Sequence, residues 1–322
     1  MDEFPLHTTA SFGERPPWRN IMLLFGFILL GMSVGNLVSL LVVMLLSQFS
    51  TPLGMDDLPE MFKNPARFPH AWAYIMINQA LVHLFTFLIP SLLYWNWSER
   101  HQIVRFIRRP WPSLPVLGLC FLVIVGFMPF NGWIIEWNSQ LALPAGLDRI
   151  EKWMQLKENE LGILSHFLMN FDQIGQLAIA LLVVAVIPAL GEEVLFRGII
   201  QRKIYNKTGD MHAAIWVSAI LFSGIHFQFY GFVPRMLLGA MFGYLYAWSH
   251  NLWAPIFGHF INNGFTILML FLQHRGLIDL DIESKQSSVS WLGAAASLLL
   301  TAVLLFNLKK IAQRASFSYD GA

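Results

Sequence analysis

Four ionisable side chains stand within long apolar stretches of this 322-residue sequence: Glu192, Glu193, His226 and His259. An ionisable group inside a membrane span is costly unless it is paired or hydrated, so each position marks a candidate functional site. Carboxylates and imidazoles are also common proton-transfer groups in enzymes. These four residues therefore point to acid–base chemistry within a membrane.

Helical spacing gives the polar residues different expected roles. Glu193 and Arg197 are four residues apart, so they share a helix face and can pair. Glu192 points about 100° away from Glu193, and we expect it to have no cation beside it. His259 and Asn263 are again four residues apart and present an imidazole and an amide on one face. We therefore expect Glu193 to be a neutralised structural carboxylate and Glu192 to be a general base.

The expected depths of these groups in the membrane overlap. At about 1.5 Å of rise per residue, Glu192, His226 and His259 lie roughly 16, 21 and 12 Å from the ends of their helices. Asn263 lies about 18 Å from the end of its helix by the same rise. These helix ends are expected on one side of the membrane, so the three helices can bring their polar groups to a common site.

These residue types favour hydrolysis. Glu192 would take a proton from water, and N–H groups of His259 and Asn263 would stabilise the negatively charged oxygen of a tetrahedral intermediate. Asn262 shares a face with His259 as well, so either asparagine fits this role. A purely structural alternative is a buried Glu–Arg pair with packed histidines that holds three helices together.

Metal binding is a separate alternative. Glu192, His226 and His259 could hold a divalent metal such as zinc. The H-E-x-x-H motif is absent, and these helices lack the Glu-x-x-His motif of di-iron bundles. We therefore expect that no cofactor is required. His83 has no comparable partner in the sequence pattern and is expected to be an ordinary buried or interfacial histidine.

The composition indicates a membrane protein. Hydrophobic residues make up 56% of the chain and charged residues 13%, about half the usual charged share of soluble domains. The net charge of +1 gives no basic field for nucleic acid. The single cysteine, Cys120, excludes an internal disulfide framework and is expected to be a buried apolar residue.

Charge-free intervals predict the membrane spans, each of which needs about 20 apolar residues. Asp, Glu, Lys and Arg are absent from 20–55, 68–98, 110–135, 173–191, 211–234, 236–274 and 286–308. The interval 236–274 is long enough for two spans, so the expected fold is all-α with about eight transmembrane helices. Lys and Arg gather at 15–19, 100–109, 202–207 and 309–314, which places both termini in the cytoplasm by the positive-inside rule. The segment 136–172 is either an amphipathic interfacial helix or a plain extracytoplasmic loop.

The polar motifs resemble those of the CPBP family of intramembrane proteases, also called the CAAX prenyl protease 2 or Abi family. The matching patterns are Glu192-Glu193-x-x-x-Arg197, Phe222-x-x-x-His226 and His259-x-x-x-Asn263, in that order and each in its own span. The flanking Phe196-Arg197-Gly198 is similar as well. The resemblance covers about residues 173–273, and the other helices match only in hydrophobicity.

This resemblance implies a membrane endopeptidase with a site that opens to the cytoplasm. By position, Glu192 would activate water, His226 would position it, and His259 and Asn263 would form the oxyanion hole. The implied organisation is a tail (1–19), three helices and a loop (20–172), a CPBP-like catalytic core with helices four to seven (173–275), and a last helix with a cytoplasmic tail (276–322). The implied partners are a lipid bilayer and a protein or peptide substrate at the membrane.

The resemblance leaves the substrate and the class of activity open. Some relatives process prenylated proteins, but no prenyl-binding site is recognisable here, so we favour a bacterial protease of the cytoplasmic membrane. One alternative is a non-catalytic bacteriocin-immunity or partner-binding protein that uses the same cavity. Another is a transporter with carboxylate proton carriers, although the broken-helix repeats of many such proteins are not evident.

Overall fold

The computed structural model describes residues 17–98, 100–279 and 289–319, and this part of the chain is helical without any strand. The α-helices are α1 (Pro17–Ser47), α2 (Asp57–Lys63), α3 (Ala71–His83), α4 (Ile89–Ser98), α5 (Arg100–Arg108), α6 (Leu114–Ser139), α7 (Asp148–Met169), α8 (Ile174–Ala180), α9 (Ile187–Glu193), α10 (Arg202–Thr208), α11 (Met211–Gly224), α12 (Phe232–Ser249), α13 (Trp253–His274) and α14 (Trp291–Tyr319). The π-helical segments are η2 (Leu84–Leu88), η3 (Leu181–Val186) and η4 (Val194–Gln201), and the 3-10 turns are η1 (Pro65–Arg67) and η5 (Phe229–Gly231).

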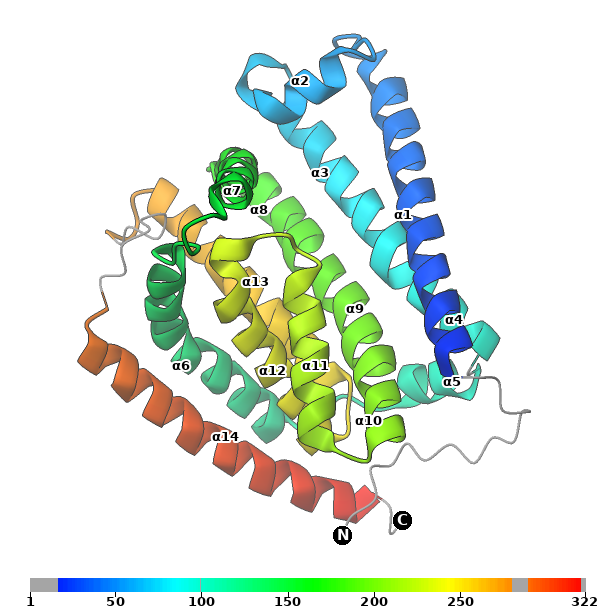
Figure 1. Cartoon of the computed structure of the whole chain (residues 1–322), viewed down its shortest axis with the longest axis vertical. Helices are drawn as coiled ribbons and strands as arrows, with labels where there is room; N and C mark the ends of the chain where they lie inside the picture. The colour runs from blue at the N-terminus through cyan, green and yellow to red at the C-terminus, as the bar shows by residue number, and fades with distance from the viewer. Residues whose placement is uncertain (1–16, 99, 280–288, 320–322) are drawn as a thin grey trace.

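Six helices of the described chain are long and apolar enough to cross a membrane, so this is a multi-pass integral membrane protein. They are Asn20–Ser47, Ala71–Ser98, Leu114–Ser139, Ile174–Thr208, Trp253–His274 and Trp291–Ile311. The sequence predicts two further crossings at α11 and α12, and α11 is apolar but has only 14 residues. The count of eight stays a prediction. α1 begins and α14 ends at the same end of the bundle, as an even number of crossings requires (Figure 1).

The helices form a central group with a helical hairpin at one side (Figure 1). The hairpin consists of α1 and the continuous α3–η2–α4 helix, joined by the Ser39 hydroxyl, which donates to Asn78 Oδ1 at 2.7 Å. The central group contains the long α8–η3–α9–η4–α10 helix with α11, α12 and α13, while α14 packs along α6. The α8–α10 helix therefore contacts both the hairpin, through η2, and the central helices, and groups from all of them can meet along it.

Three π-helical segments interrupt the membrane helices at polar positions. η2 follows His83 directly, and η4 follows Glu193 directly. Such wide turns leave carbonyl groups without their usual i+4 donors and are frequent at functional sites. In η3 the Val184 carbonyl instead accepts a hydrogen bond from Asn263 Nδ2 at 2.9 Å. Two of the wide turns thus lie beside residues that the sequence singles out, Glu193 and Asn263, and the third follows His83.

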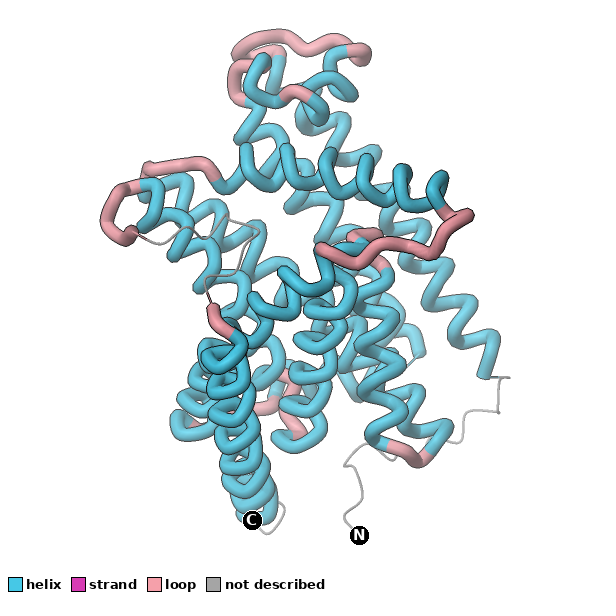
Figure 2. The backbone as a smooth tube through the Cα atoms, turned by 60° about the vertical axis from the view of Figure 1, so that its left-hand side comes forward, coloured by secondary structure: helices cyan, strands magenta, loops and turns pink. Residues whose placement is uncertain are grey.

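The segment between α6 and α8 contains a helix, as one of the two interpretations of 136–172 expects. α7 lies across the end of the bundle and is seen nearly end-on in Figure 1, whereas Figure 2 shows it crossing over the other helices. Trp72 Nε1 donates to the Leu168 carbonyl of α7 at 2.9 Å, and Trp153 packs on Phe229 with ring centroids 5.5 Å apart. α7 therefore contacts both the hairpin and the central group of helices.

Candidate functional site

Two adjacent carboxylates are buried at the end of α9. Glu192 is 3% exposed and Glu193 is fully buried. The preceding Gly191 is buried as well, so this part of the helix is surrounded by protein. A buried carboxylate is strongly destabilising unless partners compensate its lost hydration. The two carboxylates have different partners, and these partners divide the site into two clusters.

The first cluster joins Glu193, Arg197 and His259. Glu193 Oε1 accepts from Arg197 Nη1 and from His259 Nδ1, each at 2.8 Å. The pairing of Glu193 with Arg197 is thus confirmed. Since a carboxylate only accepts hydrogen bonds, the Nδ1 atom of His259 carries a proton.

Aromatic rings and a backbone carbonyl hold this cluster in place. Arg197 is fully buried, and its Nη2 donates to the Gly239 carbonyl at 2.6 Å. The guanidinium also lies over Phe222, 4.8 Å from the ring centroid, in a favourable cation–π contact. Phe242 stacks on His259 with ring centroids 5.0 Å apart and an interplanar angle of 13°. The cluster therefore ties the α9–η4 helix to α11, α12 and α13.

The second cluster gathers two histidines around Glu192. His83 Nε2 lies 3.0 Å from Glu192 Oε1, which is an ion-pair distance. His226 Nε2 lies 4.0 Å from Glu192 Oε2. His226 Nδ1 lies 2.8 Å from the Phe222 carbonyl and must donate to it, so in a neutral ring Nε2 is left as an acceptor that faces the carboxylate. The two histidine side chains are 22% and 27% exposed, so this cluster is more accessible than the first.

The sequence pattern does not place His83 beside Glu192, and the imidazole is a cation there only when it is protonated. His83, which the sequence pattern treats as an ordinary buried or interfacial histidine, is a close partner of this carboxylate. It comes from α3 in the hairpin, and helical spacing can pair residues only within one helix. One sequence feature could have identified His83 as a site residue: it stands in a charge-free interval, as His226 and His259 do.

A close helix contact brings His83 to Glu192. A Cβ atom at Gly191 would lie 3.0 Å from Phe87 Cβ and 3.2 Å from the Leu88 backbone nitrogen. Any side chain at residue 191 would therefore push η2 away from α9. The His83 ring also packs on Phe87, with ring centroids 4.5 Å apart. The absence of a side chain at Gly191 thus permits the approach that places the imidazole beside the carboxylate.

Asn263 lies beside η3. Its Nδ2 donates to the Val184 carbonyl, and its Oδ1 accepts from Asn262 Nδ2 at 3.0 Å. One of its two amide hydrogens is therefore engaged in supporting a π-helical turn, and the second can donate elsewhere. Of the six candidate residues, five lie in the two clusters and Asn263 is tied to η3.

The alternative metal-ligand set was Glu192, His226 and His259. His259 Nδ1 bonds Glu193 rather than Glu192, and His226 stands 4.0 Å from Glu192. Within the described ranges, no three His, Cys, Asp or Glu side chains are close enough together to hold a metal ion.

The comparisons with known proteins concern the central part of the chain. Residues 174–265 match the family described as type II CAAX prenyl endopeptidase Rce1-like. "Putative membrane peptidase YdiL" of Bacillus subtilis (strain 168) is 30% identical over 98 residues, which are 30% of this chain and 40% of that protein. "Uncharacterized protein YpbD" of the same organism is 27% identical over 104 residues, which are 30% of this chain and 50% of that protein.

The chain thus spans half or less of the length of these two relatives. No solved structure matches it significantly. The matched segment includes Glu192, Glu193, Arg197, His226, His259 and Asn263, whereas His83 lies outside it. The expected family is confirmed for this segment: residues 174–265 of this multi-pass membrane protein match the type II CAAX prenyl endopeptidase Rce1-like family.

Proposed function

We propose that this protein is an intramembrane endopeptidase that uses Glu192 to activate water. The observation that carries the proposal is the pair of clusters at the end of α9: one carboxylate is neutralised by an arginine, and the adjacent one faces two partly accessible imidazoles. The family match over residues 174–265 and the name of one relative, a membrane peptidase, support a peptidase.

In the proposed reaction Glu192 takes a proton from water, and the resulting hydroxide attacks the carbonyl carbon of the scissile peptide bond. The tetrahedral intermediate then collapses, the C–N bond breaks, and the proton held by Glu192 passes to the departing amine. His226 Nε2 would accept a hydrogen bond from the water, because its Nδ1 is engaged by the Phe222 carbonyl. The 4.0 Å between Nε2 and Glu192 Oε2 is a separation that one water can bridge.

The negatively charged oxygen of the intermediate needs hydrogen-bond donors. We propose His259 Nε2 and the second amide hydrogen of Asn263 for this role. His259 can donate from Nε2 only as an imidazolium, because its Nδ1–H is bonded to Glu193. With that proton, the charges of Glu192, Glu193, Arg197 and His259 sum to zero, which lowers the cost of burying them together.

We propose that the reaction requires no metal and that the substrates are membrane-associated proteins or peptides, prenylated chains included. We place the protein in a bacterial cytoplasmic membrane, as its relatives from Bacillus subtilis suggest. The proposal is tested by comparing the membrane peptidome of cells with the wild-type protein, with Glu192→Gln and without the protein. Fragments that depend on Glu192 are expected. A phenotype that persists in Glu192→Gln, without such fragments, would instead indicate a non-catalytic partner-binding protein.

A further inference from the structure

The chain turns sharply directly after His226. α11 ends at Gly224 and α12 begins at Phe232, so His226 stands in the α11–α12 connection (residues 225–231), which also contains η5. Phe227 has a φ of 52°, in the left-handed region that residues with a side chain seldom adopt. A backbone conformation of this kind persists only where the surrounding structure fixes it. The Phe227 side chain is 64% exposed, so the support must come from contacts elsewhere in the connection.

Asn138, in the last turn of α6, holds both ends of η5. Its Nδ2 donates to the Phe229 carbonyl at 3.1 Å, and its Oδ1 accepts from the Val233 backbone N–H at 2.9 Å. Asn138 is buried, with 2% of its surface exposed. Phe229 is the first residue of η5, and Val233 lies in the first turn of α12. One amide group from a distant helix therefore fixes the backbone on either side of the turn.

Two further hydrogen bonds span the same connection. Ser223, three residues before His226, donates from its hydroxyl to the Phe232 carbonyl at 2.6 Å. Arg235 donates from Nη2 to Gln228 Oε1. These bonds reach the connection from both neighbouring helices, because Ser223 belongs to α11 and Arg235 to α12. With the amide group from α6, the connection is therefore held by side chains of three helices.

This support determines where the His226 ring can lie. Its Nδ1 donates to the Phe222 carbonyl at 2.8 Å, and its Nε2 lies 4.0 Å from Glu192 Oε2. α11 ends before His226, so the residue depends on the α11–α12 connection for its placement. The ring keeps both contacts only while the connection keeps its position. A displacement of about 1 Å near the reacting groups of an enzyme can lower the rate about a hundredfold.

We infer that Asn138 is a positioning residue for the hydrolysis proposed above. By fixing the α11–α12 connection, it keeps His226 Nε2 directed at Glu192, at a separation that one water can bridge. Asn138 acts through His226 and does not itself contact the water or the substrate. The inference rests on the proposed function for its catalytic consequence, but the placement of the ring by Asn138 can be measured without any cleavage. Asn138 lies outside residues 174–265, so the family match alone does not identify it.

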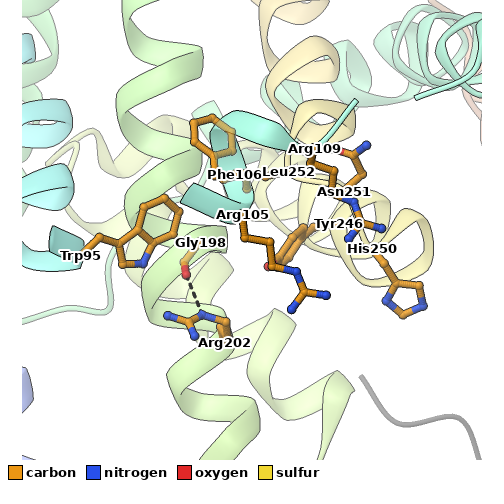
Figure 3. Close-up of a pocket in the computed structure, with 10 residues that line it drawn as sticks. All are labelled: Trp95, Arg105, Phe106, Arg109, Gly198, Arg202, Tyr246, His250, Asn251 and Leu252. Atoms are coloured by element: carbon orange, nitrogen blue, oxygen red, sulfur yellow. Dashed lines mark hydrogen bonds between the residues drawn. The ribbon is translucent and has the colours of Figure 1, made fainter. Parts of the chain in front are cut away.

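Asn251 provides a matched control at the other end of α12, where it lines the pocket of Figure 3. Its Nδ2 donates to the Pro110 carbonyl at 2.9 Å, and its Oδ1 accepts from the Trp253 backbone N–H at 3.1 Å. Asn251 is buried as well, with 7% of its surface exposed. The lining of that pocket includes no residue of 225–231. Asn251→Leu therefore removes the same kind of contact as Asn138→Leu without touching the α11–α12 connection.

The experiment compares the purified full-length wild-type protein with Asn138→Leu, Ser223→Ala and Asn251→Leu. Nitrogen NMR of isotope-labelled histidine, with His226 assigned by His226→Gln, reports which ring nitrogen carries the proton. We expect wild type and Asn251→Leu to show a neutral His226 ring protonated at Nδ1, and Asn138→Leu to show a mixture of both tautomers. In peptide cleavage, the kcat of Asn138→Leu should fall about a hundredfold with KM near that of wild type, whereas Asn251→Leu keeps its kcat. Ser223→Ala, which removes one hydroxyl group, should change both readouts in the same direction by a smaller amount.

Two results would overturn the inference. One is a His226 signal and a kcat that stay at wild-type values in Asn138→Leu, and the other is equal losses in Asn138→Leu and Asn251→Leu, which would show a general effect on the bundle. If Asn138→Leu does not fold, Ser223→Ala carries the test, and an unchanged tautomer there overturns the inference as well. The NMR comparison is repeated in Glu192→Gln, where the dependence on Asn138 is expected to remain. A tautomer that depends on Asn138 in a protein without peptidase activity would support this placement of His226 and refute only the proposed function.

Discussion

His83 Nε2 lies 3.0 Å from Glu192 Oε1, so a helix outside the family-matched segment contributes a side chain to the candidate site. The contact joins the α1–α4 hairpin to the α9 helix at the carboxylate that we propose as the base. The hairpin therefore takes part in the site and is more than a membrane anchor.

Replacement of His83 tests this contribution. We expect His83→Ala to lower kcat about a hundredfold, because an imidazole that contacts the base helps to hold its reactive state and position. Melting temperature should change little, since the side chain is partly exposed. Added imidazole should restore part of the activity of His83→Ala and none of that of Glu192→Gln. His212→Ala is the control, because His212 contacts Tyr244 and lies in neither cluster. Wild-type activity in His83→Ala would contradict this role.

The close contact at Gly191 makes a second prediction. Gly191→Ala should destabilise the protein by about 1–3 kcal/mol and lower its activity, because the added methyl group meets the η2 backbone. Gly175→Ala is the matched control: a Cβ there has no atom within 4 Å, and alanine favours the helix. The two variants are compared by thermal unfolding and by a cleavage assay. If Gly191→Ala is as stable and active as Gly175→Ala, the close approach does not position His83.

The sequence predicts the general fold and the main polar groups but misses specific contacts between helices. The 3.6-residue repeat pairs Glu193 with Arg197, and this pairing is confirmed. His83 was missed because its partner lies on another helix. The π-helical segments η2 and η4 were missed because a local change in helical repeat leaves no mark in a run of mostly apolar residues. For 136–172 the sequence allowed a helix or a loop, and packing of Trp72 against α7 accompanies the helix.

The Glu193–Arg197 pair should contribute to stability more than Glu192 does. Arg197→Met removes one of the two donors that hold the buried Glu193 carboxylate and should destabilise the protein by about 3–5 kcal/mol. The double variant Glu193→Gln/Arg197→Met should be more stable than Arg197→Met, because both charges are removed together. Chemical denaturation of the three proteins in the same detergent measures this difference. Equal stability of wild type and Arg197→Met would show that the pair is not structural.

Metal removal tests the proposed cofactor independence. Chelation with EDTA or 1,10-phenanthroline should leave cleavage unchanged, because the proposed mechanism activates water with the Glu192 carboxylate and needs no metal. Activity is measured before chelation, after it, and after zinc is added back. Loss of activity that zinc restores would refute the metal-independent mechanism and favour the alternative ligand set of Glu192, His226 and His259.

The most direct test of the central claim compares wild type, Glu192→Gln and Glu193→Gln in single-turnover cleavage of a membrane peptide in proteoliposomes. Glutamine keeps the shape of each side chain and removes its ability to accept a proton. We predict that Glu192→Gln lowers the rate by about 10³-fold or more while its melting temperature stays near that of wild type. Glu193→Gln should chiefly lower stability. Cleavage by Glu192→Gln at the wild-type rate would contradict the assignment of Glu192 as the base.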